Sequence, residues 1–514
     1  MHRAPGGRSG SCTLAPAMRR RTPLLLLCLG LSACTTSTAA PPPPPPSAAA
    51  VLAPAAPSTS SSAAVALAPE APSPGKTLRE ATLRTSVALD TVKSLVDTAS
   101  PRLSGSPGGK AAVDWAQRAM ETAGLAKVHA ESVKVPHWER GDESGEILAP
   151  HAHKLSLAAL GGSVGTPAAG IEAEVIEVDS LDALDKLDAK DVKGKIVFFH
   201  VIMERLKDGS GYGKAVRVRG SGAIAAAKLG AVGVVIRSIG TDVNRTPHTG
   251  AMRYDPKVEK IPAAALAIPD ADLLHRLVAQ GKPVRLKLKL GARSFPDADS
   301  ANMIGDVVGS SLPDEVILLG AHLDSWDLGQ GAIDDAAGCA IILEAGRQIA
   351  LLNPKPKRTV RVVFFANEEN GLAGAKAYAK AHEAEVAKHV LAFEADFGAA
   401  RVVEARYSGG EDKRPQFLTI AALLAPLGVT MSTEPAEGGA DISTLQALGV
   451  PMLDLRQDGT TYFDFHHTAN DTVERIEKAE IDQAAAAFTA AAFAAADAPS
   501  DFGRLPEERR EHRH

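Results

Sequence analysis

Acidic and imidazole side chains gather where apolar runs of strand length end. The first such run, residues 316–321, leads into His322 and Asp324 and then, after a glycine-rich loop, into Asp334 and Asp335. Ligands of α/β proteins bind at the carboxyl ends of the strands. An imidazole and a carboxylate from one loop, with a second acid to orient the imidazole, are typical of a metal site. Taken alone, this segment fits a polar loop with an Asp helix cap equally well.

Three later segments repeat the pattern, two of them after further strand-like runs and one in a loop near the C-terminus. Their ionisable residues are Glu368, Glu369, Asp396, His466 and His467. Two adjacent carboxylates at a strand end point to opposite sides, so one can bind a metal ion while its neighbour acts as a general base. A lone Glu-Glu pair would fit a solvated turn, but four such segments in one sheet are hard to explain as surface decoration.

Alternating apolar periodicities predict the elements that position these segments. Before them, we expect a helix over residues 78–98, a second helix over 110–123 and a strand over 128–135. After residue 300, we expect strands over 316–321, 360–366, 389–395 and 452–455, and helices over 335–352, 374–387, 415–427 and 479–496. This alternation predicts an α/β fold with a mixed, mostly parallel sheet flanked by helices. Cys339 falls in the helix after Asp335, where a buried small hydrophobe is expected.

Residues 155–292 differ in character and carry no cluster of His, Asp and Glu at ligand spacing. Two stretches, residues 192–197 and 225–236, resemble the protease-associated domain. We therefore expect a β-rich insert of that kind between an N-terminal part of the main domain, residues 77–154, and its catalytic part, residues 293–500. The remaining tail, residues 501–514, is charged and is expected to be frayed.

Composition limits the classes of function. The chain has 514 residues, of which 45% are hydrophobic and 23% charged, with a formal net charge of −5. This is an ordinary globular composition, long enough for two or three domains. It contains no basic stripe with interleaved aromatic residues, so nucleic acid is excluded as a partner.

The first 76 residues have the composition of a leader and a tether. Within residues 1–33, the run Arg19-Arg20-Arg21 precedes an apolar stretch too short to span a membrane, which indicates an export signal. Its end, Leu31-Ser32-Ala33-Cys34, resembles the bacterial lipobox, although a plain signal peptide is the alternative. Residues 34–76 are rich in Ala, Pro and Ser and predict a disordered tether. We expect an exported protein of the outer membrane or periplasm of a bacterium, which contacts the membrane only through a lipid anchor at Cys34.

As an ordered set, the four segments resemble the co-catalytic dizinc aminopeptidase and carboxypeptidase family over roughly residues 78–497. The resemblance implies five metal ligands: His322, Asp334, Glu369, Asp396 and His467. It implies that Asp334 bridges two ions, that Glu368 is the general base and that Asp324 orients His322. His466 competes with His467, which we prefer because Thr468, and then an acid and a Thr, follow it as in the family.

The implied cofactor is zinc, two ions per chain, because three carboxylates and a hydroxide would balance two Zn²⁺. Cobalt or manganese could substitute. The implied activity is that of an exopeptidase that hydrolyses short peptides with a metal-bridged hydroxide. The resemblance also implies a cis peptide between Asp334 and Asp335, and residues 438–443 and Tyr462 are candidates for the substrate side.

Two other functions remain open at this point. Relatives of this fold without metals are binding modules, and a glutaminyl-cyclase-like relative would be an acyl transferase with one zinc. The complete set of ligand positions and the Glu368-Glu369 pair favour the peptidase. A peptide substrate is the expected partner and a homodimer is possible, whereas the side-chain preference and the choice between aminopeptidase, dipeptidase and carboxypeptidase stay open.

Overall fold

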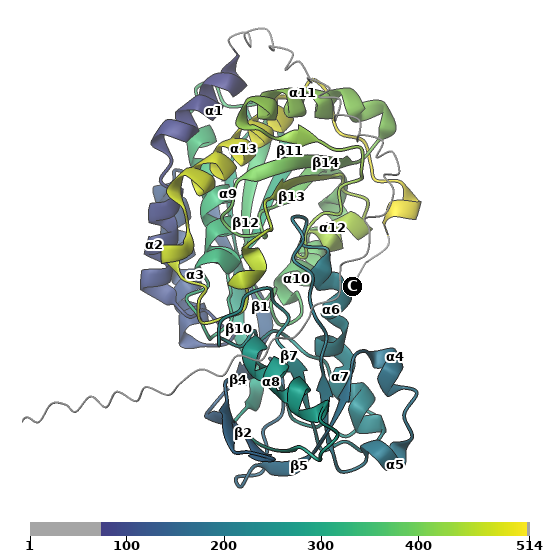
Figure 1. Cartoon of the computed structure of the whole chain (residues 1–514). Coiled ribbons are helices and arrows are strands. Elements are labelled where there is room, and N and C mark those ends of the chain that lie inside the picture. Colours follow the sequence, from purple (N-terminus) through teal and green to yellow (C-terminus); the bar gives the residue numbers. More distant parts are fainter. Residues whose placement is uncertain (1–72, 511–514) are drawn as a thin grey trace, which may run out of the picture. The chain divides into compact units, whose positions relative to one another are not determined.

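The computed structural model describes residues 73–510, which belong to one structural unit. The expected export signal, the lipobox at Cys34 and most of the tether lie outside the described residues. Within residues 73–510, no helix is both long enough and apolar enough to cross a membrane. Two sheets define two lobes, which we call the main lobe (residues 73–142 and 291–510) and the second lobe (residues 143–290), at the bottom of Figure 1.

The main lobe is built on a mixed sheet of eight strands. In spatial order they are β1 (Ala126–Glu139), β10 (Arg293–Val307), β12 (Arg358–Phe365), β11 (Leu312–His322), β13 (His389–Glu394), β16 (Met452–Gln457), β14 (Val402–Ser408) and β15 (Thr430–Met431). The four central strands, β12, β11, β13 and β16, run parallel, and antiparallel neighbours flank them. The carboxyl ends of β11, β12 and β13 therefore meet at one edge of the sheet.

Helices cover both faces of this sheet. Along β11, Ile317, Leu319 and Ala321 face one hydrophobic core, and Val316 and Leu318 face the other. The first core is closed by α1 (Pro74–Thr85), α2 (Ala88–Ala99), α3 (Pro107–Thr122), α9 (Ala337–Ala350), α11 (Arg414–Leu424) and α13 (Lys478–Asp497). The second is closed by α10 (Ala373–Ala381) and α12 (Ser443–Ala447). The predicted α/β class, a mixed sheet flanked by helices, is confirmed.

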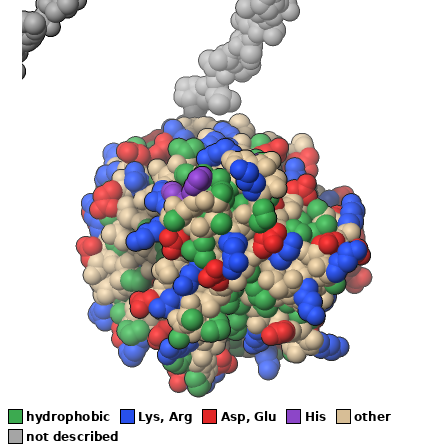
Figure 2. Space-filling view, turned by 60° about the horizontal axis from the view of Figure 1, so that its bottom comes forward, with side chains coloured by type: hydrophobic (Ala, Val, Ile, Leu, Met, Phe, Trp, Pro, Cys, Tyr) green, Lys and Arg blue, Asp and Glu red, His purple; other side chains and the backbone are tan. Residues whose placement is uncertain are grey.

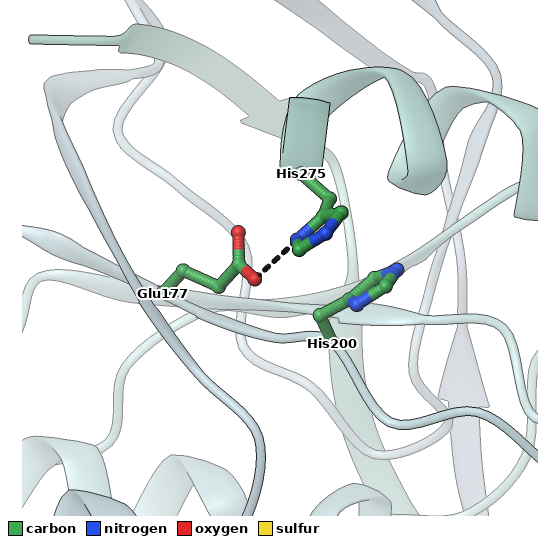
Figure 3. Close-up of side chains that lie close together, drawn as sticks. All are labelled: Glu177, His200 and His275. Atoms are coloured by element: carbon green, nitrogen blue, oxygen red, sulfur yellow. Dashed lines mark hydrogen bonds and ion pairs between the residues drawn. The ribbon is translucent and has the colours of Figure 1, made fainter. Parts of the chain in front are cut away.

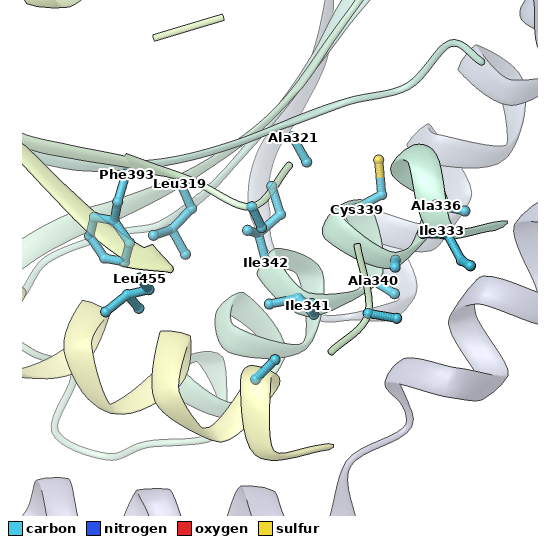
Figure 4. Close-up of a cluster of buried hydrophobic side chains, with 14 of the residues drawn as sticks. Leu319, Ala321, Ile333, Ala336, Cys339, Ala340, Ile341, Ile342, Phe393 and Leu455 are labelled. Atoms are coloured by element: carbon cyan, nitrogen blue, oxygen red, sulfur yellow. The ribbon is translucent and has the colours of Figure 1, made fainter. Parts of the chain in front are cut away.

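Helix α9 begins directly behind the glycine-rich loop and lies against the central strands. Its Ala340, Ile341 and Ile342 point into the core that also contains Leu319 and Phe393 (Figure 4). Cys339 is buried in the same core, as predicted, and its thiol donates to the backbone oxygen of His322. The packing of α9 thus fixes the loop in front of it against the ends of the strands.

Some predicted elements are wrong in detail. The single helix over residues 78–98 is two helices, α1 and α2, because Ser86 is extended and its hydroxyl accepts the N–H of Ala88. The helix expected over 374–387 ends at Ala381 and continues as a 3₁₀ segment, Glu383–Lys388. Strand β14 has no counterpart among the predicted elements. These differences concern local hydrogen bonds and edge strands, and they leave the central strands as predicted.

The second lobe has its own eight-stranded sheet. In spatial order the strands are β3 (His153–Leu155), β2 (Glu143–Ala149), β9 (Arg285–Leu290), β5 (Ile171–Val178), β6 (Ile196–Phe199), β7 (Gly233–Arg237), β8 (Ala263–Leu266) and β4 (Leu157–Ala159). The longer helices of the lobe are α7 (Arg217–Lys228) and α8 (Ile268–Val278). The sheet includes β2, so it begins before residue 155, where the sequence analysis places the start of the insert. The likeness of this lobe to a protease-associated domain stays a prediction.

The surface seen from the side of the second lobe carries both signs of charge. Lysine and arginine side chains alternate with aspartate and glutamate over the face in Figure 2. On this face the charges form no field of a single sign that would attract a polyanion.

The expected fraying of residues 501–514 is wrong for the described part of the tail. Phe502 and Leu505 are fully buried. The backbone oxygen of Phe502 accepts the hydroxyl of Tyr407 at 2.6 Å, and the N–H of Leu505 donates to Gly449 at 3.0 Å. Two apolar anchors in a charged segment suffice to hold the chain against the main lobe.

We predict that Phe502→Ala lowers the free energy of unfolding by about 3–5 kcal/mol, because it leaves a cavity where a buried ring packs. Chemical denaturation followed by fluorescence measures this. The matched control is Glu508→Ala on the exposed part of the tail, which should change stability by less than about 0.5 kcal/mol. Equal midpoints for the two variants would contradict the packed tail.

Candidate metal centre

His322 is the last residue of β11 and is almost completely buried. Its Nδ1 lies 3.0 Å from the backbone oxygen of Asp324. A carbonyl oxygen can only accept, so Nδ1 carries the hydrogen and Nε2 offers its lone pair. Nε2 faces Asp334 Oδ1 at 3.1 Å and Asp396 Oδ1 at 3.4 Å. The carboxylate predicted to orient this ring, that of Asp324, is 3.8 Å from Nδ1, so its main-chain oxygen is in better position for that role.

Asp334 and Asp335 follow the glycine-rich loop and point in different directions. The peptide bond between them is cis, as the sequence analysis expects. Asp335 faces the helix side, where its carboxylate accepts the backbone N–H groups of His322 and Gly338 at 3.1 and 3.0 Å. Asp334 faces the site, where its two oxygens lie 3.1 Å from His322 Nε2 and 3.3 Å from His467 Nε2. One carboxylate therefore stands between two imidazoles.

The Glu368-Glu369 pair follows β12 in a tight turn that begins at Asn367, whose φ is +64°. Glu369 Oε2 lies 3.0 Å from His467 Nε2. Glu368 is half-buried, and its backbone N–H donates to the carboxylate of Asp324 at 3.0 Å. The turn thus directs one glutamate to an imidazole and ties its neighbour to the loop after β11.

The two adjacent histidines are not equivalent. His467 reaches both Glu369 and Asp334, whereas His466 Nε2 lies 3.6 Å from Asp334 Oδ2 and stacks on His467 with 3.5 Å between ring centroids. Asp396, just past β13, completes the set next to His322. The structure therefore brings all five predicted metal ligands together, with His467 in the better position of the two histidines.

Electrostatics make the centre of this cluster attractive to a cation. Burial disfavours the charged form of His322, but Asp396 and Asp334 outweigh burial and raise its pKa well above the usual range. Burial likewise opposes the charge on His467, yet Glu369 and Asp334 raise its pKa to about 9. Burial, together with the neighbouring carboxylates, raises the pKa of Glu368 well above its usual range. The carboxylates stay charged most easily where positive charge lies among them.

The residues present fit a pair of divalent metal ions. Asp334 Oδ2 and Glu369 Oε1 are buried and have no hydrogen-bond partner among residues 73–510. His322, Asp334 and Asp396 form one group with converging donor atoms, and Asp334 with the two histidines forms a second. A mixture of imidazole and carboxylate donors suits zinc and similar first-row ions.

Two residues that support the site were not recognised as such from the sequence. Arg102 is fully buried and donates to the backbone oxygens of Leu323, Gln330 and Gly331, each at 2.8 Å, so it holds both ends of the glycine-rich loop. Asp471 accepts the N–H groups of Ile333 and Asp334 at 2.6 and 3.2 Å. The available signals were an Arg in the Pro-Arg-Leu-Ser-Gly turn and an acid three residues after Thr468.

Two cavities near the cluster share Phe397 in their lining. One, of about 140 Å³, is lined by Asp396, Gly438 and Gly439 together with residues of β16. The other, of about 380 Å³, is lined by Ile333 and Tyr462 among others. Gly438 and Gly439, proposed for the substrate side, thus border open space next to Asp396, and Tyr462 borders the second cavity, whose lining includes none of the five predicted ligands.

A further imidazole cluster lies in the second lobe, although sequence spacing gave no sign of it. Glu177 of β5, His200 after β6 and His275 of α8 lie side by side (Figure 3). His275 Nδ1 is 2.6 Å from Glu177, and His200 Nε2 is 3.1 Å from Asp272. The two rings are parallel within 4°, with centroids 4.2 Å apart. Imidazole lone pairs lie in the ring plane, so parallel stacked rings cannot both address one ion in this arrangement.

Comparison with known proteins agrees with the geometry. The family model described as "Peptidase family M28" matches residues 302–492. Carboxypeptidase Q of Mus musculus is 40% identical over 403 residues, which cover 78% of this chain and 84% of that protein. A peptidase M28 precursor from Shewanella amazonensis is 44% identical in sequence, with a TM-score of 0.83 over 84% of this chain and 98% of that one. A zinc aminopeptidase from Bacillus subtilis has a TM-score of 0.59 at 22% identity, over 82% of this chain and 98% of that one, and so shares the fold.

The chain belongs to peptidase family M28. The resemblance to the aminopeptidase and carboxypeptidase family and the prediction of a metallo-exopeptidase are thereby confirmed. The reading as a binding module without activity loses its support.

We predict that Arg102→Met destabilises the protein by at least about 3 kcal/mol, because three buried carbonyl oxygens lose a charged donor. Denaturation midpoints measure the loss. Arg118→Met removes an exposed guanidinium from α3 and should change stability by less than about 0.5 kcal/mol. If both variants unfold alike, Arg102 does not hold the loop.

Proposed function

We propose that the protein is a zinc-dependent exopeptidase that hydrolyses short peptides. His322 and Asp396 would hold one zinc ion, Glu369 and His467 the other, and Asp334 both. The observation that carries this proposal is the position of Asp334, whose two oxygens each face a different imidazole, 3.1 and 3.3 Å away. The names of the relatives, a carboxypeptidase and a zinc aminopeptidase, support the choice of metal and substrate class.

When bound, two zinc ions lower the pKa of a water molecule and polarise the scissile carbonyl group. Glu368 takes the proton of the attacking water and passes it to the nitrogen of the leaving amine. Its backbone is tied to Asp324, whose carboxylate also accepts the hydroxyl of Ser104 at 3.0 Å. Asp324 thus keeps the base beside the ligand loop, and its main-chain oxygen fixes the His322 ring.

The two cavities that Phe397 lines are suited to the substrate. The smaller one adjoins Asp396 and offers the backbone of Gly438 and Gly439 to an extended peptide. The cavities hold only about 140 and 380 Å³, which supports small substrates over folded proteins. Whether one residue is removed from the N-terminus or a dipeptide is split would be decided by digestion of a mixed peptide library, with products read by mass spectrometry.

We predict that Glu368→Gln lowers kcat on the order of 10²–10⁴-fold, because an amide cannot accept the proton of water. Both metals should remain bound, since no proposed ligand is changed. Glu369→Gln should reduce the metal content as well as the activity. Elemental analysis and dipeptide hydrolysis measure the two effects, and Glu383→Gln on the surface is the matched control.

The opposite pattern, with metal lost in the first variant and retained in the second, would exchange the roles of the two glutamates. If neither variant loses activity, the proposed peptidase site is wrong. Chelation of wild-type protein should abolish hydrolysis, and added zinc should restore it.

We propose further that the protein is exported and anchored by lipid at Cys34, on the basis of the lipobox and the tether that follows it. Fully extended, the roughly 40-residue tether would reach on the order of 130 Å from the bilayer. Cys34→Ser should move the protein from the membrane fraction to the soluble fraction of the producing cell. Unchanged membrane association would exclude this anchor.

A further inference from the structure

We infer that the second lobe positions parts of the metal site and thereby raises its affinity for metal. It holds two segments of the metal site in place, which we call the Trp326 loop (residues 323–331) and the His467 loop (residues 458–471). The first follows His322 and precedes Asp334, and the second carries His467. The inference rests on the proposed function, because it concerns the affinity of that site for metal.

The first connection is an apolar seat for Trp326. This side chain is buried in the hydrophobic core of the second lobe, together with Trp138 and Ala159. Its six-membered ring lies directly over Gly161, where a Cβ atom would come within 1.8 Å of Cη2. The same ring meets His467 edge-on, with centroids 5.7 Å apart. Gly161 is therefore required for the tryptophan to reach its seat and support the imidazole.

The second connection is an ion pair beside that seat. Arg140, at the crossing from β1 to β2, donates to both carboxylate oxygens of Asp327 at 2.8 and 2.6 Å. It also donates to the backbone oxygen of Ala159 and, at 3.2 Å, to the hydroxyl of Thr249. The guanidinium thus joins the Trp326 loop to two segments of the second lobe. A bidentate pair fixes direction as well as distance.

The third connection fixes His467 itself. The N–H of Thr249 donates to the backbone oxygen of His467 at 3.0 Å, and the oxygen of Thr249 lies 3.3 Å from His467 Nδ1. Arg219 lies 3.4 Å from that oxygen and from Nδ1, so both donors converge on the carbonyl. The oxygen of Thr249 can only accept, so its contact places the hydrogen on Nδ1 and leaves Nε2 to face Glu369 and Asp334; the contact with Arg219, which would need an acceptor at Nδ1, is the longer of the two.

Further bonds attach the rest of the His467 loop to the second lobe. His248 lies between the backbone oxygen of His466, 2.8 Å from Nδ1, and the carboxylate of Asp242, 2.9 Å from Nε2. Arg205 pairs with Asp464 at 2.6 and 2.9 Å. Partners that orient a ligating histidine typically change metal affinity 10–100-fold when they are lost.

The test is to disturb the tryptophan seat without touching a ligand. Gly161→Ala should weaken binding of one of the two zinc ions 10–100-fold, measured by competition with a chromogenic chelator on metal-free protein that is then titrated with zinc. Gly213→Ala adds the same methyl group to the helix Gly211–Ala215 of the second lobe, where nothing lies within 4 Å of it, and should leave both affinities unchanged. Circular dichroism and thermal melting establish that each variant is folded.

A compensating change separates positioning from general damage. Trp326→Phe removes the ring atoms that would meet the new methyl group, so Gly161→Ala with Trp326→Phe should bind zinc as Trp326→Phe alone does. If Gly161→Ala does not fold, Asp327→Asn, which breaks the bidentate pair, replaces it and should weaken the same zinc ion.

The outcomes distinguish a failure of the proposed function from a failure of the role inferred for the second lobe. Wild-type protein that binds no zinc at this site would overturn the proposed function. Wild-type protein that binds two zinc ions, with folded Gly161→Ala and Asp327→Asn variants of unchanged affinity, would overturn only the role of the second lobe. Weaker binding in Gly161→Ala and Asp327→Asn, with no further effect of Gly161→Ala in the Trp326→Phe background, would support it.

Discussion

The site depends on one carboxylate held between two imidazoles. The two carboxylate oxygens of Asp334 face histidines from two different loops, so these contacts alone do not fix the position of Asp334. Its position comes instead from its backbone, since its N–H and that of Ile333 are bound by Asp471. Arg102 fixes the loop immediately before it. A buried anion is tolerated only where such bonds and nearby positive charge compensate its lost hydration.

The sheet explains how distant segments reach this point. Parallel neighbours deliver the ends of β11, β12 and β13 to one edge, so three of the four ligand segments are placed by the core itself. The fourth, the His467 loop, belongs to no strand of this edge and needs another support. The second lobe is connected to the end of the antiparallel pair β1 and β10 where Glu139 pairs with Arg293. From there it contacts the His467 loop, for example through the backbone hydrogen bond from Thr249 to His467.

The sequence was sufficient for features that are local. Strands β11, β12 and β13 are apolar runs, and each has a predicted ligand at its end or within a few residues of it, so both could be predicted together. Asp324 shows the limit: its carboxylate was expected on His322, but the closer contact is its main-chain oxygen, which no residue pattern encodes. Arg102, Gly161 and Thr249 act across large separations in the chain. Arg102 does so within the main lobe, and Gly161 and Thr249 do so between the two lobes. No local periodicity reports contacts of either kind.

The contrast between His466 and His467 shows why residue type alone does not define a ligand. Both are buried imidazoles near Asp334. His467 has a φ of +63°, and its Nδ1 lies 3.3 Å from the oxygen of Thr249. His466 Nδ1 is buried with no hydrogen-bond partner among residues 73–510, and burial lowers the pKa of this ring well below the usual range. Because no acceptor lies at Nδ1 of His466, no hydrogen bond selects the tautomer in which Nδ1 carries the hydrogen and Nε2 has a free lone pair. In His467 the oxygen of Thr249, a residue of the second lobe, selects that tautomer.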